Sequence, residues 1–205
     1  LGRFRQVEER NRSVAARYEE IDAQNNHLAN LYVASYQLHA TLDFSEVLDT
    51  VKEILINLIG AEAFGIFWVD ERHHHLKTEA SQGMGTSVPD KIRPDRGPLQ
   101  RAAAGESYYA DPLPDPAGVD AAHPIACVPL RIGTRVIGVI AIYRLLTQKE
   151  RFEPLDFELF TLLAGHAATA LFSSKLYQRS EKKLSEIQGF LDLLTAPSSP
   201  GAGAP

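Results

Sequence analysis

The chain has a single cysteine, a single methionine and a single tryptophan among its 205 residues. One cysteine, Cys127, excludes an intramolecular disulfide and every zinc or iron–sulfur site that needs several thiolates. No apolar run reaches the roughly 20 residues that span a bilayer, and residues 1–5 lack the apolar core of a signal peptide. These absences predict a cytoplasmic protein without membrane contact. Because the chain begins with Leu1, we expect it to be a piece of a longer protein.

An excess of charge of either sign is also missing. The net charge of −5 provides no basic field for phosphate backbones, so a nucleic-acid partner is not expected. The hydrophobic fraction of 44% and the charged fraction of 23% lie near the averages for soluble globular proteins. The length then indicates one folded core with extensions.

Residues 1–42 contain no proline and only one glycine, and their apolar residues recur in alternating steps of four and three. This seven-residue repeat predicts a signalling helix that pairs with a second copy as a coiled coil. Asparagines in the seam would weaken the pairing but fix its register. The alternative is an ordinary amphipathic helix packed on its own domain. The two seam positions are occupied by Val7, Val14, Ile21 and Leu28, and by Asn11, Tyr18, Asn25 and Tyr32.

A second helix is expected after Asp43, because Asp43 and Glu46 have the spacing of a capping box. Its apolar residues follow helical spacing until Gly60, a typical residue after a helix end. A β-branched and aromatic run over 63–69 and a second run over 76–81 then predict a hairpin.

The stretch 83–123 is rich in glycine, proline and aspartate, with a helical piece at 99–104 and a strand-like piece at 107–110. A second hairpin is predicted over 125–145, turning at Gly133–Thr134 as a type II′ turn requires. Its second strand is apolar throughout 136–143, which predicts a central strand covered on both faces.

Pro154 predicts the start of a long last helix, which continues towards Leu194 without an evident breaker. A helix of that length extends about 60 Å, more than one small domain covers. Its outer part, including Tyr177 and Leu184, is therefore expected to find a partner. Residues 196–205 read as a disordered tail or linker.

Several phrases, in this order and spacing, resemble the GAF family of small-molecule-binding and signalling domains. They are residues 30–35 leading into 41–43, Cys127–Arg131, Val136–Ala141 and Phe152–Ala170, and the likeness covers about 31–172. The resemblance implies an α+β fold: a central antiparallel sheet with helices on one face and a ligand pocket or partner surface on the other. The expected division is a coiled-coil helix at 1–42, a GAF domain at 43–172, a helical extension at 173–195 and a tail at 196–205.

Candidate ligand-binding residues come from the irregular stretch and the neighbouring strand ends, because they combine apolar rings with a few polar groups. The alternative is that the tyrosines pack a loop on the sheet and that Arg96 caps a helix. The candidates are Gln82, Arg96, Leu99, Tyr108, Tyr109 and Asp111.

Three other features favour structural roles. Cys127 lies in an apolar strand, where a cysteine is usually a small core residue. The consecutive histidines 73–75 alternate between faces on a strand and lack further ligands, so exposed turn residues are expected and no metal. Lys149, Phe152 and Asp156 only partly match the pattern of GAF domains that bind cyclic nucleotides.

No phosphate loop, nucleophile elbow or His-Glu-x-x-His helix is present, so neither catalytic residues nor a cofactor are expected. The sequence predicts a non-catalytic bacterial regulatory module: a homodimeric GAF sensor that binds a small ligand of unidentified class or a signalling protein and relays the event through its flanking helices. One alternative is a ligand-free protein–protein scaffold. Another is the regulatory fragment of a histidine kinase or a cyclic-nucleotide enzyme.

Overall fold

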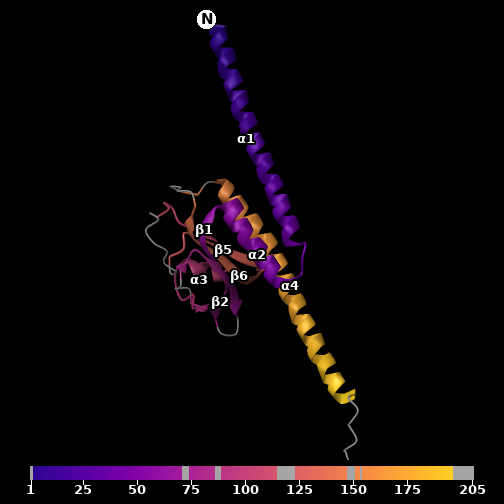
Figure 1. Ribbon diagram of the computed structural model, residues 1–205. Coiled ribbons are helices and arrows are strands. Elements are labelled where there is room, and N and C mark those ends of the chain that lie inside the picture. Colours follow the sequence, from indigo (N-terminus) through magenta and orange to yellow (C-terminus); the bar gives the residue numbers. More distant parts are fainter. Residues whose placement is uncertain are drawn as a thin grey trace, which may run out of the picture.

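The computed structural model describes residues 2–70, 74–85, 89–114, 123–146, 151–152 and 154–195, and Figure 1 shows their arrangement. Helices and strands alternate along the chain as an α+β fold. In order they are α1 (Gly2–Leu38), α2 (Phe44–Ile54), the π-helical turn η1 (Leu55–Ile59), β1 (Ala61–Asp70), β2 (His75–Gln82), β3 (Lys91–Ile92), α3 (Pro98–Ala103), β4 (Tyr108–Tyr109), β5 (Ala126–Ile132), β6 (Arg135–Leu145) and α4 (Pro154–Thr195).

The strands form one six-stranded sheet in the order β3-β2-β1-β6-β5-β4, and every neighbouring pair is antiparallel. Strand β6 lies between β1 and β5, and its residues 137–143 are buried, so the prediction of a central strand covered on both faces is confirmed. The short strand β3 was not predicted. It lies within the stretch that was expected to be irregular, because two residues are too few to give an alternating pattern.

Local signals at the element ends act as predicted. The carboxylate of Asp43 accepts hydrogen bonds from the backbone N–H groups of Ser45 and Glu46, which caps α2. The N–H of Asp43 itself donates to the Thr41 hydroxyl at 3.1 Å, a bond that the predicted capping box would have assigned to Glu46. Gly60 ends the helical segment with a left-handed φ of 72°.

One face of the sheet, here called the helix face, is covered by α1, α2 and α4 (Figure 1). The largest apolar cluster lies there and includes residues from every one of these helices and from β1, β5 and β6. Its central side chains are almost completely inaccessible to solvent: Leu38, Val47, Phe64 and Leu171 are each at most 1% exposed. Burial of so much apolar surface is the main source of stability for this half of the fold.

The opposite face, here called the α3 face, carries a smaller apolar cluster beneath α3. The helical piece predicted at 99–104 is observed as the six-residue helix α3, which covers part of this second face. Strand alternation places neighbouring residues on the two faces, so that Phe64 and Ile66 belong to the helix face and Ala63 and Phe67 to the α3 face.

The two long helices, of 37 and 42 residues, run in the same direction beside each other, and they project from opposite ends of the domain (Figure 1). Only the last turns of α1 pack on the domain, through the buried residues Ala34 and Leu38. Every described side chain from residue 10 to residue 33 is exposed. Helix α1 ends at Leu38, earlier than the predicted residue 42.

Helix α4 is long enough and, over its most apolar window, hydrophobic enough to cross a bilayer by length and composition alone. In the fold, 44% of that window is buried. The buried residues, among them Leu163, Ala167 and Leu171, face the sheet and the other helices. Part of its apolar surface is thus buried inside the domain, and part remains exposed.

Candidate functional site

On the α3 face, where the family resemblance places a ligand pocket, the residues that the structure describes form a buried apolar cluster. The ring of Phe67 lies over Gly65, so close that a Cβ built on this glycine would be 2.5 Å from the ring. Leu99 from α3, Met84 and Tyr143 are each less than 10% exposed and complete the cluster. This face is therefore packed as a second small core.

The two candidate tyrosines lie on opposite faces of the sheet. Tyr108 pairs with Cys127 and packs on the α3-face cluster, where the Arg101 guanidinium lies 5.9 Å from its ring centre. Tyr109 pairs with Ala126 and packs on the helix face. There its ring meets three phenylalanines with centroid distances of 4.7 to 5.8 Å: Phe152, Phe157 and Phe160.

The structure thus brings together only part of the predicted ligand-binding set. Leu99 and Tyr108 belong to the α3-face cluster, whereas Tyr109 lies across the sheet. Gln82, Arg96 and Asp111 are exposed. Gln82 sits at the end of β2, opposite Phe64 of β1.

The other residues singled out from the sequence have mainly structural surroundings. Cys127 is fully buried, and burial raises the pKa of its thiol far above the ordinary range, which makes it a poor nucleophile. Phe152 packs in the aromatic cluster around Tyr109. Lys149 lies outside the described residues.

The histidine run is only partly exposed. His74 is exposed with φ of 49°, and His73 lies outside the described residues. His75 was expected to be exposed, but it begins β2 opposite Asp70, and its Nε2 lies 3.8 Å from the Asp70 carboxylate with 10% of the side chain exposed. The ranges that the structure describes contain no group of three or more metal-ligand side chains.

The helices present the most extensive exposed apolar surface. On α1 the predicted seam residues Val14, Tyr18, Ile21 and Tyr32 are 44 to 75% exposed. The side chains of Val7 and Leu28 lie outside the described residues. On α4 the exposed apolar residues at helical spacing form two groups: Leu155 and Leu162 near its start, and Leu176, Tyr177, Leu184, Ile187 and Leu191 on its outer part.

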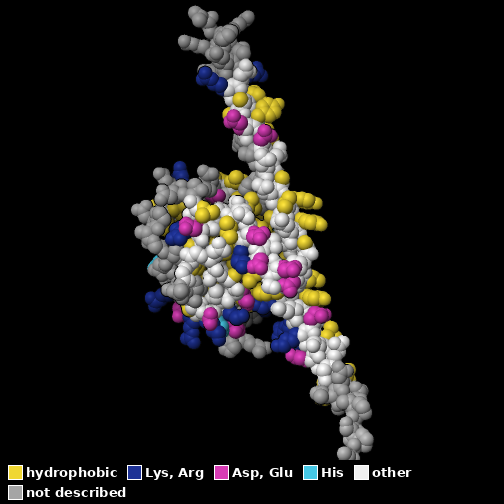
Figure 2. Space-filling model, viewed as in Figure 1, with side chains coloured by type: hydrophobic (Ala, Val, Ile, Leu, Met, Phe, Trp, Pro, Cys, Tyr) yellow, Lys and Arg dark blue, Asp and Glu magenta, His cyan; other side chains and the backbone are white. Residues whose placement is uncertain are grey.

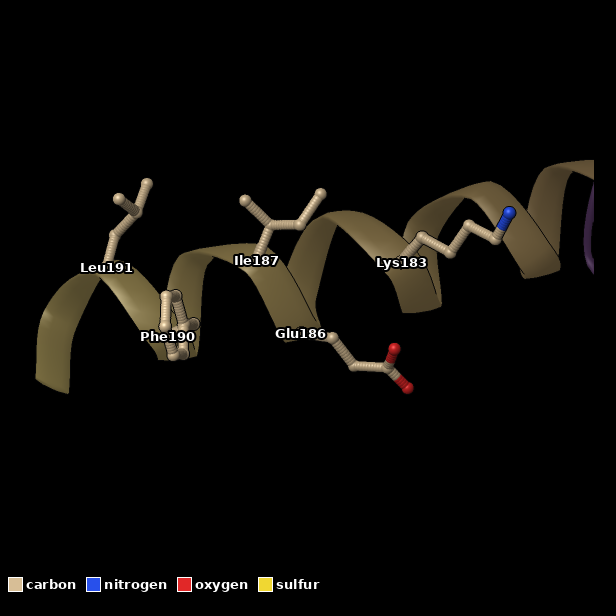
Figure 3. A pocket seen from close by; sticks show the side chains of 5 residues that line it. All are labelled: Lys183, Glu186, Ile187, Phe190 and Leu191. Atoms are coloured by element: carbon tan, nitrogen blue, oxygen red, sulfur yellow. The ribbon is translucent and has the colours of Figure 1, made fainter.

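The outer end of this α4 surface is a shallow hollow formed by one helix face alone. Its walls are Lys183, Glu186, Ile187, Phe190 and Leu191 (Figure 3). In Figure 3, Ile187 and Leu191 project to the same side of the helix, as residues four apart must. Figure 2 shows hydrophobic side chains gathered along the edge of the molecule where the helices lie. Exposed apolar surface of this kind marks an interaction site rather than a pocket for a small ligand.

A polar link joins the sheet to α4 near the point where the helix leaves the domain. The Lys175 ammonium lies 2.6 Å from Glu79 Oε1, 3.9 Å from the centre of the Trp68 ring and 5.0 Å from that of Phe44. Burial lowers the pKa of Lys175, and the Glu79 carboxylate partly offsets that effect. From Leu176 onward, every α4 side chain described is exposed. Lys175 is thus the last described residue of α4 whose side chain packs against the domain.

The position of Glu79 results from an irregularity in the sheet. Ile66 pairs with Ala80 and Phe67 with Thr78, so Glu79 is the extra residue of a β-bulge. A bulge redirects a side chain, and here it directs a carboxylate with 10% exposure to the helix face. Sequence reasoning missed this link. The available signal was that Lys175 continues the buried ridge of Ala168 and Leu171 at i+7 and i+4.

A second polar contact ties α1 to α4. The Ser35 hydroxyl is 3.1 Å from His166 Nδ1, and the rings of His39 and His166 meet edge to face with centroids 6.0 Å apart. These contacts lie where α1 reaches the domain, so α4 is contacted by the incoming helix and by the sheet. An arrangement of this kind can couple the two helices mechanically through the domain.

Comparison with known proteins agrees with this architecture. A GAF domain family model matches residues 41–171, whereas no curated protein matches the chain. Among solved structures, the GAF domain of a phosphoenolpyruvate-protein phosphotransferase from Coxiella burnetii superposes with a TM-score of 0.61 at 17% identity, covering 75% of this chain and 97% of that one.

Two further solved structures come from proteins with different activities. A methyl-accepting chemotaxis protein fragment has a TM-score of 0.56 at 21% identity, covering 70% of this chain and 98% of that one. A free methionine-R-sulfoxide reductase from Neisseria meningitidis has a TM-score of 0.56 at 21% identity, covering 74% and 91%. At these identities the likeness shows the fold alone. With the family match over residues 41–171, the chain belongs to the GAF domain family, whose members commonly act as sensory or regulatory domains in signalling proteins.

Proposed function

We propose that this chain is a non-catalytic, homodimeric signalling module that passes a change in its GAF domain along α1 and α4. The observation that carries the proposal is the arrangement of these helices. They run beside each other on one face and project from opposite ends (Figure 1). Both helices leave apolar residues exposed. A second copy would cover both stripes around one two-fold axis.

The domain has a physical means of influencing its outgoing helix. Lys175 ties α4 to Glu79 and Trp68 on two strands, and Ser35 and His39 tie α1 to the same helix through His166. A ligand or protein partner shifts the helices only if it binds two helix arrangements with different affinity. In this proposal the helix pair is the two-state element, and the α3 face is where the partner or ligand acts.

The dimer is tested by sedimentation equilibrium on the whole chain and on two variants. Leu184→Glu places a charge in the exposed apolar stripe. We expect the dimer dissociation constant to rise at least tenfold, which corresponds to about 1.4 kcal/mol. Lys182→Glu on the opposite side of the same turn is the matched control and should leave the dimer intact. A wild-type monomer at micromolar concentration, with melted flanking helices by circular dichroism, contradicts the proposal.

A second candidate function is a ligand-free scaffold that brings signalling proteins together. The buried cluster on the α3 face favours it, because Phe67, Leu99 and Tyr143 pack inside this cluster and are almost inaccessible from outside. Native mass spectrometry of the purified protein separates the two functions. A dimer with retained mass supports a small-ligand sensor, whereas a dimer that stays empty against a panel of nucleotides and metabolites supports the scaffold.

The proposed setting is the cytoplasm, with a signalling domain joined to α4. Histidine kinases and cyclic-nucleotide enzymes are the classes of output that such a helix would serve. Fusion of α4 to a kinase of known activity, with the helix phase varied by single residues, tests whether the module regulates an output domain.

A further inference from the structure

The heptad positions and charges on the outer part of α1 distinguish between the ways in which two copies could pair. Residues 10–29 lie away from the domain, and their described side chains are all exposed (Figure 1). Val14 is followed four residues later by Tyr18, which is followed three residues later by Ile21. In a heptad the step from d to a is four residues and the step from a to d is three. Tyr18 is therefore an a residue, and Val14 and Ile21 are d residues.

The a positions alternate between asparagine and tyrosine. Asn11 and Asn25 are two heptads apart, with Tyr18 between them and Tyr32 after them. In a parallel, in-register pair each a residue faces its own copy, so that each asparagine amide meets an identical amide and the two can hydrogen bond. In an antiparallel pair, a residues face d residues, and the amides would be buried against aliphatic side chains such as Val14. An unpartnered buried amide costs free energy, which disfavours the antiparallel arrangement.

The charges beside the seam give an independent criterion. Arg10 and Arg17 occupy g positions, and Asp22 occupies an e position; all three are exposed. In a parallel pair a g residue faces the e residue five positions later on the partner, which places Arg17 opposite Asp22. In an antiparallel pair, g faces g and e faces e, so that Arg17 and Asp22 could not pair across the seam. The charges therefore favour the same orientation as the asparagines.

We propose that α1 forms a parallel, in-register, two-stranded coiled coil with a second copy of this chain, specified by the Asn11 and Asn25 layers and by Arg17–Asp22 pairs. This inference rests on the proposed dimeric function and adds its orientation and register. The seam asparagines lower the stability of the coiled coil but restrict it to one register, as polar a residues do. A pair held this way can transmit rotation or separation of the helices without slipping.

Charge reversal in the full chain tests the orientation by the sign of its effect. Arg17→Glu places two acidic residues opposite each other in the parallel pair, and we expect the dimer dissociation constant to rise several-fold at low salt. The double variant Arg17→Glu/Asp22→Arg restores the pair and should return the constant to the wild-type value. An unchanged or tighter association of Arg17→Glu alone shows that Arg17 does not face Asp22 and overturns the proposal.

Cysteine cross-linking tests the register. Asn25→Cys places two thiols in one layer, and we expect a disulfide-linked dimer on mild oxidation. Ala16→Cys, at the exposed f position on the outer side of α1, is the matched control and should remain reduced. The native Cys127 is fully buried and does not interfere.

The outcomes separate the two levels of the proposal. A dimer that persists while Asn25→Cys fails to cross-link overturns the register and leaves the dimeric function standing. A chain that is monomeric by sedimentation overturns both. Cross-linking of Asn25→Cys but not Ala16→Cys, together with rescue by the double charge reversal, supports the inference.

Discussion

The helix face and the α3 face of the same sheet differ in what covers them. On the helix face, three helices and the sheet bury a large apolar cluster, which includes residues from α1 to Phe160 of α4. On the α3 face, a six-residue helix covers a smaller cluster, and the chain beside it is largely irregular. Stability rises with buried apolar area, so the helix face holds the fold together, whereas the α3 face can yield at lower cost. In the proposed function, the helix face would stay rigid while the α3 face responds.

Truncating one leucine on each face should show the largest difference. Leu171→Ala on the helix face, where the residue is 1% exposed, should cost about 4 kcal/mol, because the surrounding helices cannot close the cavity. Leu99→Ala, at 5% exposure beneath α3, should cost about 2 kcal/mol, because a short helix can move inward. Urea unfolding followed by Trp68 fluorescence at fixed protein concentration measures both. Equal costs would remove the proposed contrast between the faces.

Adding a methyl group to two glycines tests the same contrast in the opposite direction. A Cβ on Gly138 would lie 2.5 Å from the backbone oxygen of Phe67, which cannot move without breaking the sheet. We expect Gly138→Ala to cost about 3 kcal/mol. A Cβ on Gly65 would instead meet the Phe67 ring, and that side chain can turn if the α3 face yields. Gly65→Ala should then cost about 1 kcal/mol in the same unfolding experiment. A cost for Gly65→Ala as large as that for Gly138→Ala would show a rigid α3 face.

The polar link at the edge of the helix face should contribute less than the cores. Lys175→Met leaves the Glu79 carboxylate without its nearest partner, and we expect a loss of about 2 kcal/mol, between the values for exposed and buried pairs. Lys182→Met, on the free part of α4, should be neutral. The double variant with Glu79→Gln measures the coupling of the pair. A shift in Trp68 emission only in the Lys175 variants would show that the ammonium, and not the fold as a whole, has changed.

The helix cap provides the smallest expected effect and a dependence on pH. Hydrogen bonds from the Ser45 hydroxyl and from the Glu46 and Ser45 N–H groups lower the pKa of Asp43. A lowered carboxylate pKa gives stability that is present above the pKa of the unfolded chain and is lost as pH falls through the folded pKa. Asp43→Asn keeps a capping oxygen but cannot titrate, so wild type and variant should converge in stability at acid pH. Parallel stability curves between pH 7 and pH 2 would contradict this assignment.

Much of the fold is predictable because local signals and tertiary packing agree. Asp43 caps α2, Gly60 ends the helical segment, and Gly133 turns the second hairpin with φ of 59°. A helix N-cap needs a side chain that accepts backbone hydrogen bonds, and a left-handed backbone favours glycine. At such positions the residue type therefore predicts the local structure. The family resemblance rests mainly on other residues, the apolar framework segments such as Cys127–Arg131 and Val136–Ala141.

The candidate site was harder to predict because it depends on faces and irregularities. Tyr108 and Tyr109 were grouped by their distance along the chain, although adjacent strand residues must point to opposite faces. The bulge at Glu79 and its pairing with Lys175 depend on the register between two strands and on the docking of a helix 96 residues away. A single sequence does not specify such long-range registers.

Helix α1 reaches the domain from one end, and α4 runs beside its last turns and leaves at the other end (Figure 1). Each residue added to a straight helix advances it by about 1.5 Å and turns it by about 100°. Insertion of seven residues after Lys175 therefore nearly restores the original angular phase of whatever follows, whereas insertion of one to three residues turns it to another side. The module thus has a discrete set of compatible fusions, and their spacing follows the heptad rather than distance alone.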